Sequence, residues 1–340
     1  MPEETGSTAR VPQMMRRLGR SGIQVSALGL GTARIGGLGW SRQGDLGRSI
    51  NPDEIAESTH AIHRALDWGV NFLDTADVYG GGQSECILGQ ALATRRTRVV
   101  IATKFGEPFD EATSQPVETP ITYEYVRRAC ASSLRRLKTD YIDLYLFHRR
   151  DYDLARAGEV QQALEDLVQA GAIRAYGWST DDVTRARFFA QGSGCTAIEH
   201  RLNILNDAPE MLALCDEHNL ASINRIPLLT GVLTGRWTAE TRLAETDRRS
   251  DWFREEGFLR VLEHAEALRS ILTRDGRSYV HGALGWIWAR SARTIPIPGF
   301  RTGAQAEELA RAMEFGALAE SQLREIQEML WSRSKSPPAA

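Results

Sequence analysis

Four polar side chains in the first half of the sequence have the types needed to place a proton on a developing oxyanion. Asp74 ends the stretch VNFLD, Tyr79 follows five residues later, Lys104 ends RVVIATK, and His148 ends YIDLYLFH. Lys104 is one of three lysines in a chain with 41 lysines and arginines in total. A lysine at the end of an apolar run, in a chain so rich in arginine, indicates a need for a compact charge on a flexible stem.

These residue types suit the protonation of a carbonyl oxygen while a hydride adds to the carbonyl carbon. A free tyrosine, with a pKa of about 10, is a weak acid at neutral pH, but a nearby ammonium favours the phenolate and lowers that pKa. Asp74 would neutralise Lys104 and hold it against the Tyr79 hydroxyl, and His148 could donate a hydrogen bond to the carbonyl oxygen. The planar guanidinium of an arginine would bind best to a group with two oxygens, whereas the phenol has only one.

The segments that end in these side chains belong to a longer series of apolar, β-rich runs. Eight such runs alternate with amphipathic stretches typical of helices, at residues 23–31, 70–74, 98–104, 141–148, 173–179, 195–199, 220–226 and 293–299. This alternation predicts a parallel sheet covered by helices, and eight repeats predict a closed (β/α)8 TIM barrel. Because barrels keep their chemistry at the carboxyl ends of their strands, Asp74, Lys104, His148 and Ser179 should meet at one mouth.

The connections between the runs are uneven in length. The long ones follow the first, third and seventh runs, which puts them on the carboxyl-end face of the barrel, at 32–52, 105–121 and 227–257. The stretch RLGRSGIQVS (17–26) has turn-forming residues and could form a hairpin that caps the bottom of the barrel. We expect one barrel domain over 14–331, with disordered tails at 1–13 and 332–340.

Composition indicates a globular protein and argues against several other classes. The 340 residues are 42% hydrophobic and 25% charged, and the net charge of −3 at pH 7 is too small to indicate a nucleic-acid or membrane-surface partner. The four cysteines lie far apart without C-x-x-C spacing, so neither a disulfide framework nor a metal site is expected. No apolar segment approaches the ~20 residues of a transmembrane helix. With a polar N-terminus that lacks a signal-peptide core, we expect a cytoplasmic location and no protein partner.

The order and spacing of these motifs resemble the aldo-keto reductase family, and its general bacterial branch in particular, over roughly residues 15–331. The resemblance runs through LGLGT, GVNFLDTADVYGGGQSECILGQAL, VVIATKFG, YIDLYLFH, AYGWST, PLLTGVLTGR and IPGFRTGAQAEEL. It implies a TIM barrel with NADP(H) extended across its mouth. It also implies catalytic roles for Asp74, Tyr79, Lys104 and His148.

The resemblance further implies which residues hold the cofactor. Ser179 and Thr180 match the pair at the nicotinamide carboxamide, 227–235 matches the loop over the pyrophosphate, and 299–308 matches the adenosine end. The full set is Gly31, Thr32, Ser179, Thr180, Glu199, Arg225, Pro227, Leu228, Gly231, Leu233, Gly235, Gly299, Arg301, Thr302, Gln305 and Glu308. Independently of the family, Arg301 stands just before a helix start near Thr302. Amide donors and the positive helix end would add to its guanidinium there, which favours NADPH with its additional phosphate.

Four positions depart from the pattern of the family. Glu199 stands where glutamine usually faces the carboxamide, Thr180 replaces an asparagine, and Leu309 replaces the asparagine that meets adenine. Arg225 stands where many members stack a tyrosine on the nicotinamide, as in one bacterial branch, and it could pair with Glu199. An ionised Glu199 cannot donate to the carboxamide and would attract the positive ring of the oxidised cofactor. We therefore predict altered cofactor affinity rather than a loss of chemistry.

The primary hypothesis is NADPH-dependent reduction of an aldehyde or ketone, with Arg34 and Trp40 of the first long loop as candidate substrate contacts. Trp40 could equally pack within its loop, and sugars, short aldehydes and terpenoid ketones all stay open as substrates. Although GLGTARIGG superficially looks like a dinucleotide-binding glycine loop, Arg34 stands where that loop requires its third glycine.

Three other interpretations stay open. Lys104 and Asp74 could form only a structural ion pair at the top of the barrel. The chain could be an NADP(H)-binding regulatory subunit with little turnover, since barrels of this family also serve as redox-sensing partners of channels. It could also use bound NADP⁺ for epimerisation or dehydrogenation of a sugar.

Overall fold

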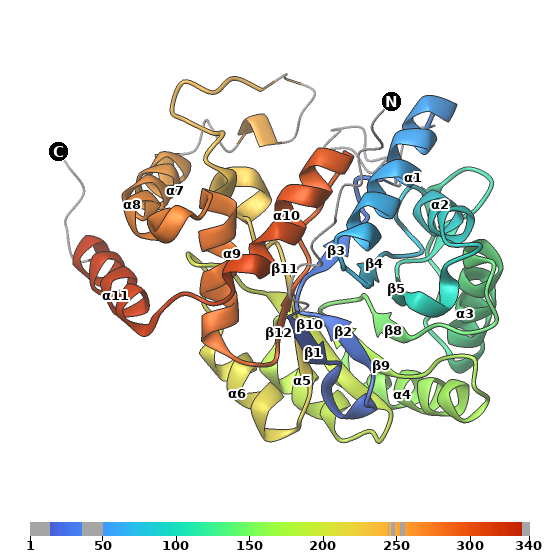
Figure 1. The fold of residues 1–340 in the computed structure, drawn as a ribbon. Helices are drawn as coiled ribbons and strands as arrows, with labels where there is room; N and C mark the ends of the chain where they lie inside the picture. Colours follow the sequence, from blue (N-terminus) through green and yellow to red (C-terminus); the bar gives the residue numbers. More distant parts are fainter. Residues whose placement is uncertain (1–13, 36–49, 244, 246–248, 252–255, 335–340) are drawn as a thin grey trace.

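The computed structural model describes residues 14–35, 50–243, 245, 249–251 and 256–334. A ring of eight parallel strands surrounded by helices lies at its centre, which confirms the expected (β/α)8 barrel (Figure 1). The strands follow one another around the ring in chain order: β3 Gly29–Gly31, β4 Phe72–Asp74, β5 Val100–Phe105, β8 Leu144–Phe147, β9 Tyr176–Ser179, β10 Cys195–Arg201, β11 Ala221–Arg225 and β12 Thr294–Pro296. The ring closes where the Gly31 amide donates to the Pro298 carbonyl oxygen at 3.0 Å.

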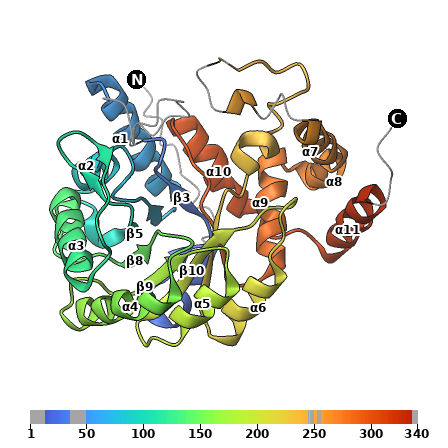
Figure 2. The same cartoon turned by 180° about the vertical axis from the view of Figure 1, so that it is seen from behind.

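One helix follows each strand of the ring and covers its outer side. These helices are α1 Pro52–Asp67, α2 Gln83–Ala91, α3 Tyr123–Leu137, α4 Leu154–Gln169, α5 Val183–Ala190, α6 Pro209–Glu217, α9 Tyr279–Arg290 and α10 Gly303–Phe315. Three further helices lie together beside α9, as Figures 1 and 2 show: α7 Glu256–Ala267, α8 Arg269–Leu272 and α11 Glu320–Ser334. Short 3-10 turns add η1 Gly19–Ser21, η2 Arg96–Arg98, η3 Leu229–Thr234 and η5 Arg274–Gly276.

Side-chain caps fix where the two helices nearest the closure of the ring begin. Asn51 accepts from the Glu54 amide at 2.9 Å, and the Glu54 carboxylate accepts from the Asn51 amide at 3.1 Å, which forms a capping box at α1. Thr302 caps α10 by accepting from the Gln305 amide. The first turns of α1 and α10 are therefore defined by their own sequences.

The barrel interior is packed by alternate residues of the strands. Its apolar cluster consists of Leu18, Ile23, Val25, Phe72, Val100, Ala102, Leu144, Leu146, Ala175, Ala197, Ala221, Ile223, Ile295 and Ile297. A larger cluster fills the space between the strands and the helices. Because strand side chains alternate between the two faces, the inward positions at the carboxyl ends come two residues after the last of these apolar residues.

A hairpin closes the amino end of the barrel, as expected. Its strands are β1 Met15–Arg17 and β2 Gln24–Ser26, and Arg20 in the turn donates to the carbonyl oxygen of Cys195, at the start of β10, at 2.7 Å. Gly19 has φ +54°, and a side-chain carbon there would lie 2.1 Å from the Thr196 carbonyl oxygen, so the close approach requires glycine. The expectation of one strand over 23–31 is wrong, because this run divides into the hairpin strand β2 and the barrel strand β3.

The long connections lie on the carboxyl-end face. The one after β5 contains a small hairpin, β6 Phe109–Asp110 with β7 Gln115–Pro116. Parts of the other two, and the expected tail at 1–13, lie outside the described residues. The expected tail at 332–340 begins too early, because α11 continues to Ser334, and 335–340 lie outside the described residues. None of the helices in the described ranges combines the length and apolarity that crossing a bilayer requires.

Candidate active site

The strand tips place a set of polar side chains at the mouth of the barrel. Each of them stands two or four residues after an apolar residue of the interior cluster, so the alternation of the strand turns it inward. The set consists of Asp74, Lys104, His148, Ser179, Glu199 and Arg225. The barrel thus brings together side chains that lie far apart in the sequence.

The Lys104 ammonium is completely buried and serves two carboxylates. Its Nζ lies 2.6 Å from both carboxylate oxygens of Asp74 and donates to the Thr75 carbonyl oxygen at 2.9 Å. Oε2 of Glu199 lies 3.3 Å from the same Nζ, while Oε1 of Glu199 accepts from the Ser179 hydroxyl at 2.9 Å. Asp74 and Glu199 are each only 2% exposed.

Burial and pairing act in opposite directions on these three charges. Burial alone would lower the pKa of Lys104, but Asp74 and Glu199 outweigh it and raise that pKa. Burial raises the pKa of Asp74 well above its ordinary value, with Glu199 adding to the rise and Lys104 opposing it. Burial also acts to raise the pKa of Glu199, but Lys104, His148 and Arg225 outweigh it and lower that pKa. Lys104 therefore keeps its proton, and the cluster has more acidic than basic groups.

Tyr79 and His148 lie beside this cluster. Lys104 Nζ is 5.4 Å from the centre of the Tyr79 ring, and the Tyr79 and His148 rings meet edge to face with their centroids 6.1 Å apart. In the described structure no hydrogen bond joins Lys104 to the Tyr79 hydroxyl. Burial raises the pKa of Tyr79 to about 12 although Lys104 lowers it, so the net shift is opposite to the one expected from the sequence. Burial, and then Lys104, lowers the pKa of His148 to about 3. At neutral pH the site holds a protonated phenol and a neutral imidazole.

Arg225 and Thr180 make contacts other than those expected. Arg225 does not pair with Glu199, because its Nη2 donates to Oδ2 of Asp181, a residue that sequence reasoning missed. The Thr180 hydroxyl donates to the carbonyl oxygen of Arg150 at 2.9 Å, so it fixes the loop after β8. The hydroxyl of Thr180 is thereby committed within the protein.

A cavity of about 570 Å³ opens from these residues. It is lined by Asp74, Tyr79, His148 and Glu199, and by nine more of the expected contacts: Gly31, Arg34, Arg225, Pro227, Leu228, Gly231, Gly299, Arg301 and Gln305. Over the described residues, the lining leaves out Lys104, Thr32, Ser179, Thr180, Leu233, Gly235, Thr302 and Glu308. Most of these lie behind the wall: Lys104, Thr32, Ser179, Thr180 and Leu233 are all fully buried. Trp40 lies outside the described residues.

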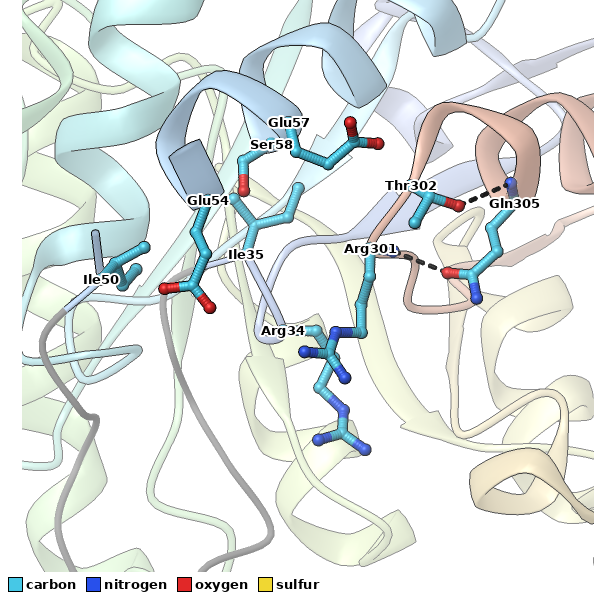
Figure 3. A pocket seen from close by; sticks show the side chains of 9 residues that line it. All are labelled: Arg34, Ile35, Ile50, Glu54, Glu57, Ser58, Arg301, Thr302 and Gln305. Carbon is cyan, nitrogen blue, oxygen red and sulfur yellow. Dashed lines mark hydrogen bonds between the residues drawn. The ribbon is translucent and has the colours of Figure 1, made fainter. Parts of the chain in front are cut away.

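A second cavity, of about 320 Å³, lies between α1 and the start of α10 and shares Arg34, Arg301 and Gln305 with the first (Figure 3). The amides at the start of α10 already have acceptors: that of Arg301 donates to Gln305 Oε1 at 2.9 Å, and that of Gly303 donates to Glu57 at 3.2 Å. The guanidinium groups of Arg34 and Arg301 are therefore the main groups that this place offers to a phosphate, with less help from helix amides than the sequence suggested.

The two cavities fit a nucleotide cofactor such as NADP(H). Arg34, Arg236, Arg249 and Arg301 line the main cavity and would supply positive charge for the phosphates of such a cofactor. At the other end, His148 Nδ1 is buried without a hydrogen-bond partner among the described residues, and Glu199 Oε2 has only the ion pair with Lys104 at 3.3 Å. Buried polar atoms without hydrogen bonds are uncommon in folded proteins, so this place suits a polar ligand. Within the described residues, no group of three His, Cys, Asp or Glu side chains could hold a metal ion.

Several lining residues were absent from the sequence-based set: Ala33, Arg150, Ile226, Thr230, Thr234, Arg236, Trp237, Arg249, Ile297, Pro298 and Phe300. Arg236 belongs to the segment PLLTGVLTGR, and Arg150 stands two residues after His148. A search one turn beyond each strand tip would have found Arg150.

Comparisons with known proteins agree with this geometry. The model of the Aldo/keto reductase family matches residues 27–330. The NADH-specific methylglyoxal reductase of Escherichia coli is 32% identical over 308 residues, which cover 87% of this chain and 92% of that protein. The 6-dehydroglucose reductase of Novosphingobium aromaticivorans is 31% identical over 324 residues, which cover 89% and 91%. The solved structure of the glycerol dehydrogenase of Gluconobacter oxydans is similar with a TM-score of 0.82 at 27% identity, covering 96% of this chain and 98% of that one.

Proposed function

We propose that this chain, which belongs to the aldo/keto reductase family, reduces an aldehyde or ketone to an alcohol with NADPH. The observation that carries the proposal is the buried ion cluster of Lys104, Asp74 and Glu199 beside Tyr79, where Tyr79 and His148 line one cavity. Burying charged groups costs desolvation free energy, and a buried ion pair adds little to stability in return. Charges buried in this way are therefore typical of catalytic sites.

Each residue of this site has a role that follows from its charge and place. Bound NADPH supplies the hydride. Tyr79 holds its proton at neutral pH and gives it to the oxygen of the substrate, and the Lys104 ammonium stabilises the phenolate that this leaves. Asp74 keeps Lys104 charged and in position, at 2.6 Å. His148 is neutral, so it orients the carbonyl group by donating a hydrogen bond rather than by transferring a proton.

Arg34 and Arg301 favour NADPH over NADH. Both guanidinium groups line the second cavity, where they would pair with the additional phosphate of NADPH. A relative with 32% identity is named as specific for NADH, so the cofactor preference of this chain needs its own measurement.

The direct test is the oxidation of NADPH and of NADH in the presence of a panel of reactive aldehydes, including methylglyoxal. We expect turnover with at least one aldehyde and a lower KM for NADPH than for NADH. Binding of NADPH without turnover of any aldehyde, ketone or sugar would contradict the proposal and support a regulatory subunit instead.

Glu199 favours a second candidate, oxidation of an alcohol with NADP⁺ at the same site. Its carboxylate is 2% exposed and lines the cavity, where it would stabilise the positive ring of the oxidised cofactor. A similar solved structure is that of a glycerol dehydrogenase. Reduction of NADP⁺ by a panel of polyols and sugars tests this direction, and a faster oxidation than reduction at equal pH would favour it.

A further inference from the structure

We propose that Arg150 forms a carboxylate-binding subsite beside Tyr79 and His148, so that this chain selects carbonyl substrates that carry a carboxylate. The inference rests on the proposed function and names the substrate class of the same site. Arg150 lines the main cavity together with Tyr79 and His148, and it follows His148 by two residues at the carboxyl end of β8.

The loop that carries Arg150 is held in place by side chains of the next strand and helix. Trp178 and Thr180 donate to the carbonyl oxygens of residues 149 and 150, both at 2.9 Å. Arg185 donates to the carbonyl oxygens of residues 151 and 152 at 3.2 and 3.0 Å. Four consecutive carbonyl groups thus accept hydrogen bonds from side chains. These bonds hold the backbone that carries the Arg150 side chain in one conformation.

The Arg150 guanidinium itself has neither an ion pair nor a hydrogen-bond acceptor in the described structure. Its neighbours differ: Arg149 lies 3.8 Å from the Glu107 carboxylate, and Arg225 pairs with Asp181. Arg150 is an exposed residue at the mouth of the cavity, where desolvation of its guanidinium, and then the like charge of Arg225, lower the pKa of Arg150, although Asp181 and Glu199 act in the opposite direction. An exposed cation on a loop with a fixed backbone, close to another cation, offers its guanidinium to an anion that enters the cavity.

The carboxylates that interact electrostatically with Arg150 each have another cation as their ion-pair partner. Asp181 pairs with Arg225, Glu199 with Lys104 and Glu107 with Arg149. We therefore infer that the anion that pairs with Arg150 belongs to a bound substrate.

The phosphates of the cofactor have other partners. Arg34 and Arg301 line the main cavity and also the second one, and the lining of the second cavity includes none of Tyr79, His148 and Arg150. Arg150 instead lies at the end of the main cavity where the carbonyl group is proposed to react. A carboxylate pairs with the planar guanidinium through two parallel hydrogen bonds, as a phosphate also does, and it is the smaller of these two anions.

The test compares acids with their uncharged esters. We would measure kcat/KM for 3- and 4-carboxybenzaldehyde and for the methyl ester of each, because esterification removes the charge and changes the aldehyde little. We expect a preference for at least one acid over its ester. In Arg150→Met the acid-to-ester ratio should fall by about 10- to 100-fold, as expected for a lost charge-assisted hydrogen bond.

Arg149→Met is the matched control. It removes the same charge from the adjacent position, but Arg149 is absent from the described lining of the cavity and is paired with Glu107. We expect it to leave the acid-to-ester ratio unchanged. Equal use of acids and esters by the unmodified chain, or equal effects of Arg149→Met and Arg150→Met, would overturn the proposal.

Binding separates a failure of this inference from a failure of the proposed function. The affinity of the same acids and esters is measured by calorimetry on the Tyr79→Phe chain loaded with NADPH, where turnover is expected to be slow enough for binding to be measured. A preference for the acid that Arg150→Met abolishes supports the subsite even if the unmodified chain oxidises no NADPH, in which case only the proposed reaction fails. Equal binding of acid and ester overturns the subsite whatever the activity.

Discussion

The two ends of the proposed site hold their charges in different ways. At the proposed reaction end, made of Asp74, Tyr79, Lys104, His148 and Glu199, the charged side chains are buried and paired with one another. At the proposed adenosine end, made of Arg34, Arg301, Thr302 and Gln305, Arg301 and Thr302 are exposed and the side chains come from a loop and the start of a helix (Figure 3). The reaction end is therefore part of the core, whereas the adenosine end lies on its surface.

The difference in burial indicates which properties each end of the site controls. A buried charge depends on its partners, so a change at the reaction end should alter stability and chemistry together. An exposed arginine can be removed with little effect on folding, so a change at the adenosine end should alter binding alone. Substitutions at the two ends test this contrast.

The largest effect is expected for Lys104→Met. This change leaves Asp74 and Glu199 buried without their cation, and we expect the free energy of unfolding to fall by about 3–5 kcal/mol. Urea denaturation measures it. The double variant Lys104→Met/Glu199→Gln should recover part of the loss, because it removes one of the two stranded carboxylates. An unchanged urea midpoint for Lys104→Met would show that the folded protein does not depend on Lys104 to stabilise Asp74 and Glu199.

A smaller effect, on binding only, is expected for Arg301→Gln. Loss of one charge-assisted contact to the additional phosphate should raise the KM for NADPH by about 10- to 100-fold and leave the KM for NADH unchanged. Arg311→Gln is the matched control, since Arg311 lies on α10, the helix that Arg301 precedes, and pairs with Glu314 at 3.5 Å. A loss of stability in Arg301→Gln, or an equal rise for both cofactors, would break the contrast between the two ends.

The smallest of these effects is expected for Glu199→Gln. Removal of a negative charge near the nicotinamide should shift the ratio of NADP⁺ to NADPH affinity towards NADPH by about tenfold. Fluorescence titration with each nucleotide measures this ratio. Ser179→Ala, which removes the hydrogen bond to Glu199 without changing charge, should leave the ratio unchanged. If Glu199→Gln changes the affinity for neither nucleotide, Glu199 does not influence cofactor binding.

Much of the fold could be predicted from the sequence because barrel strands are short apolar runs with regular spacing. The exception, at 23–31, arose because β2 and β3 follow each other directly, so the hairpin strand and the first barrel strand form one apolar run. Only the pairing of β2 with β1 separates them. The strand propensity of these residues alone does not show that the run divides into two strands.

The sequence predicted which residues form the reaction end better than it predicted how their charges interact. Strand tips identified Asp74, Lys104 and His148 from the residues alone, whereas Glu199 and Arg225 entered through the family resemblance. The partners of these two charges depend on side-chain positions across strands: Glu199 lies against Lys104 and Arg225 against Asp181. The direction of the pKa shift of Tyr79 depends on its burial, which the sequence does not specify.

The central claim is that the Tyr79 hydroxyl delivers the proton that completes carbonyl reduction. Single-turnover oxidation of bound NADPH by a reactive aldehyde, compared between the unmodified chain and Tyr79→Phe, measures this step without the contribution of product release. We expect Tyr79→Phe to lower the rate by about 100- to 10,000-fold and to bind NADPH with unchanged affinity. An equal rate of NADPH oxidation in the two proteins would contradict this claim.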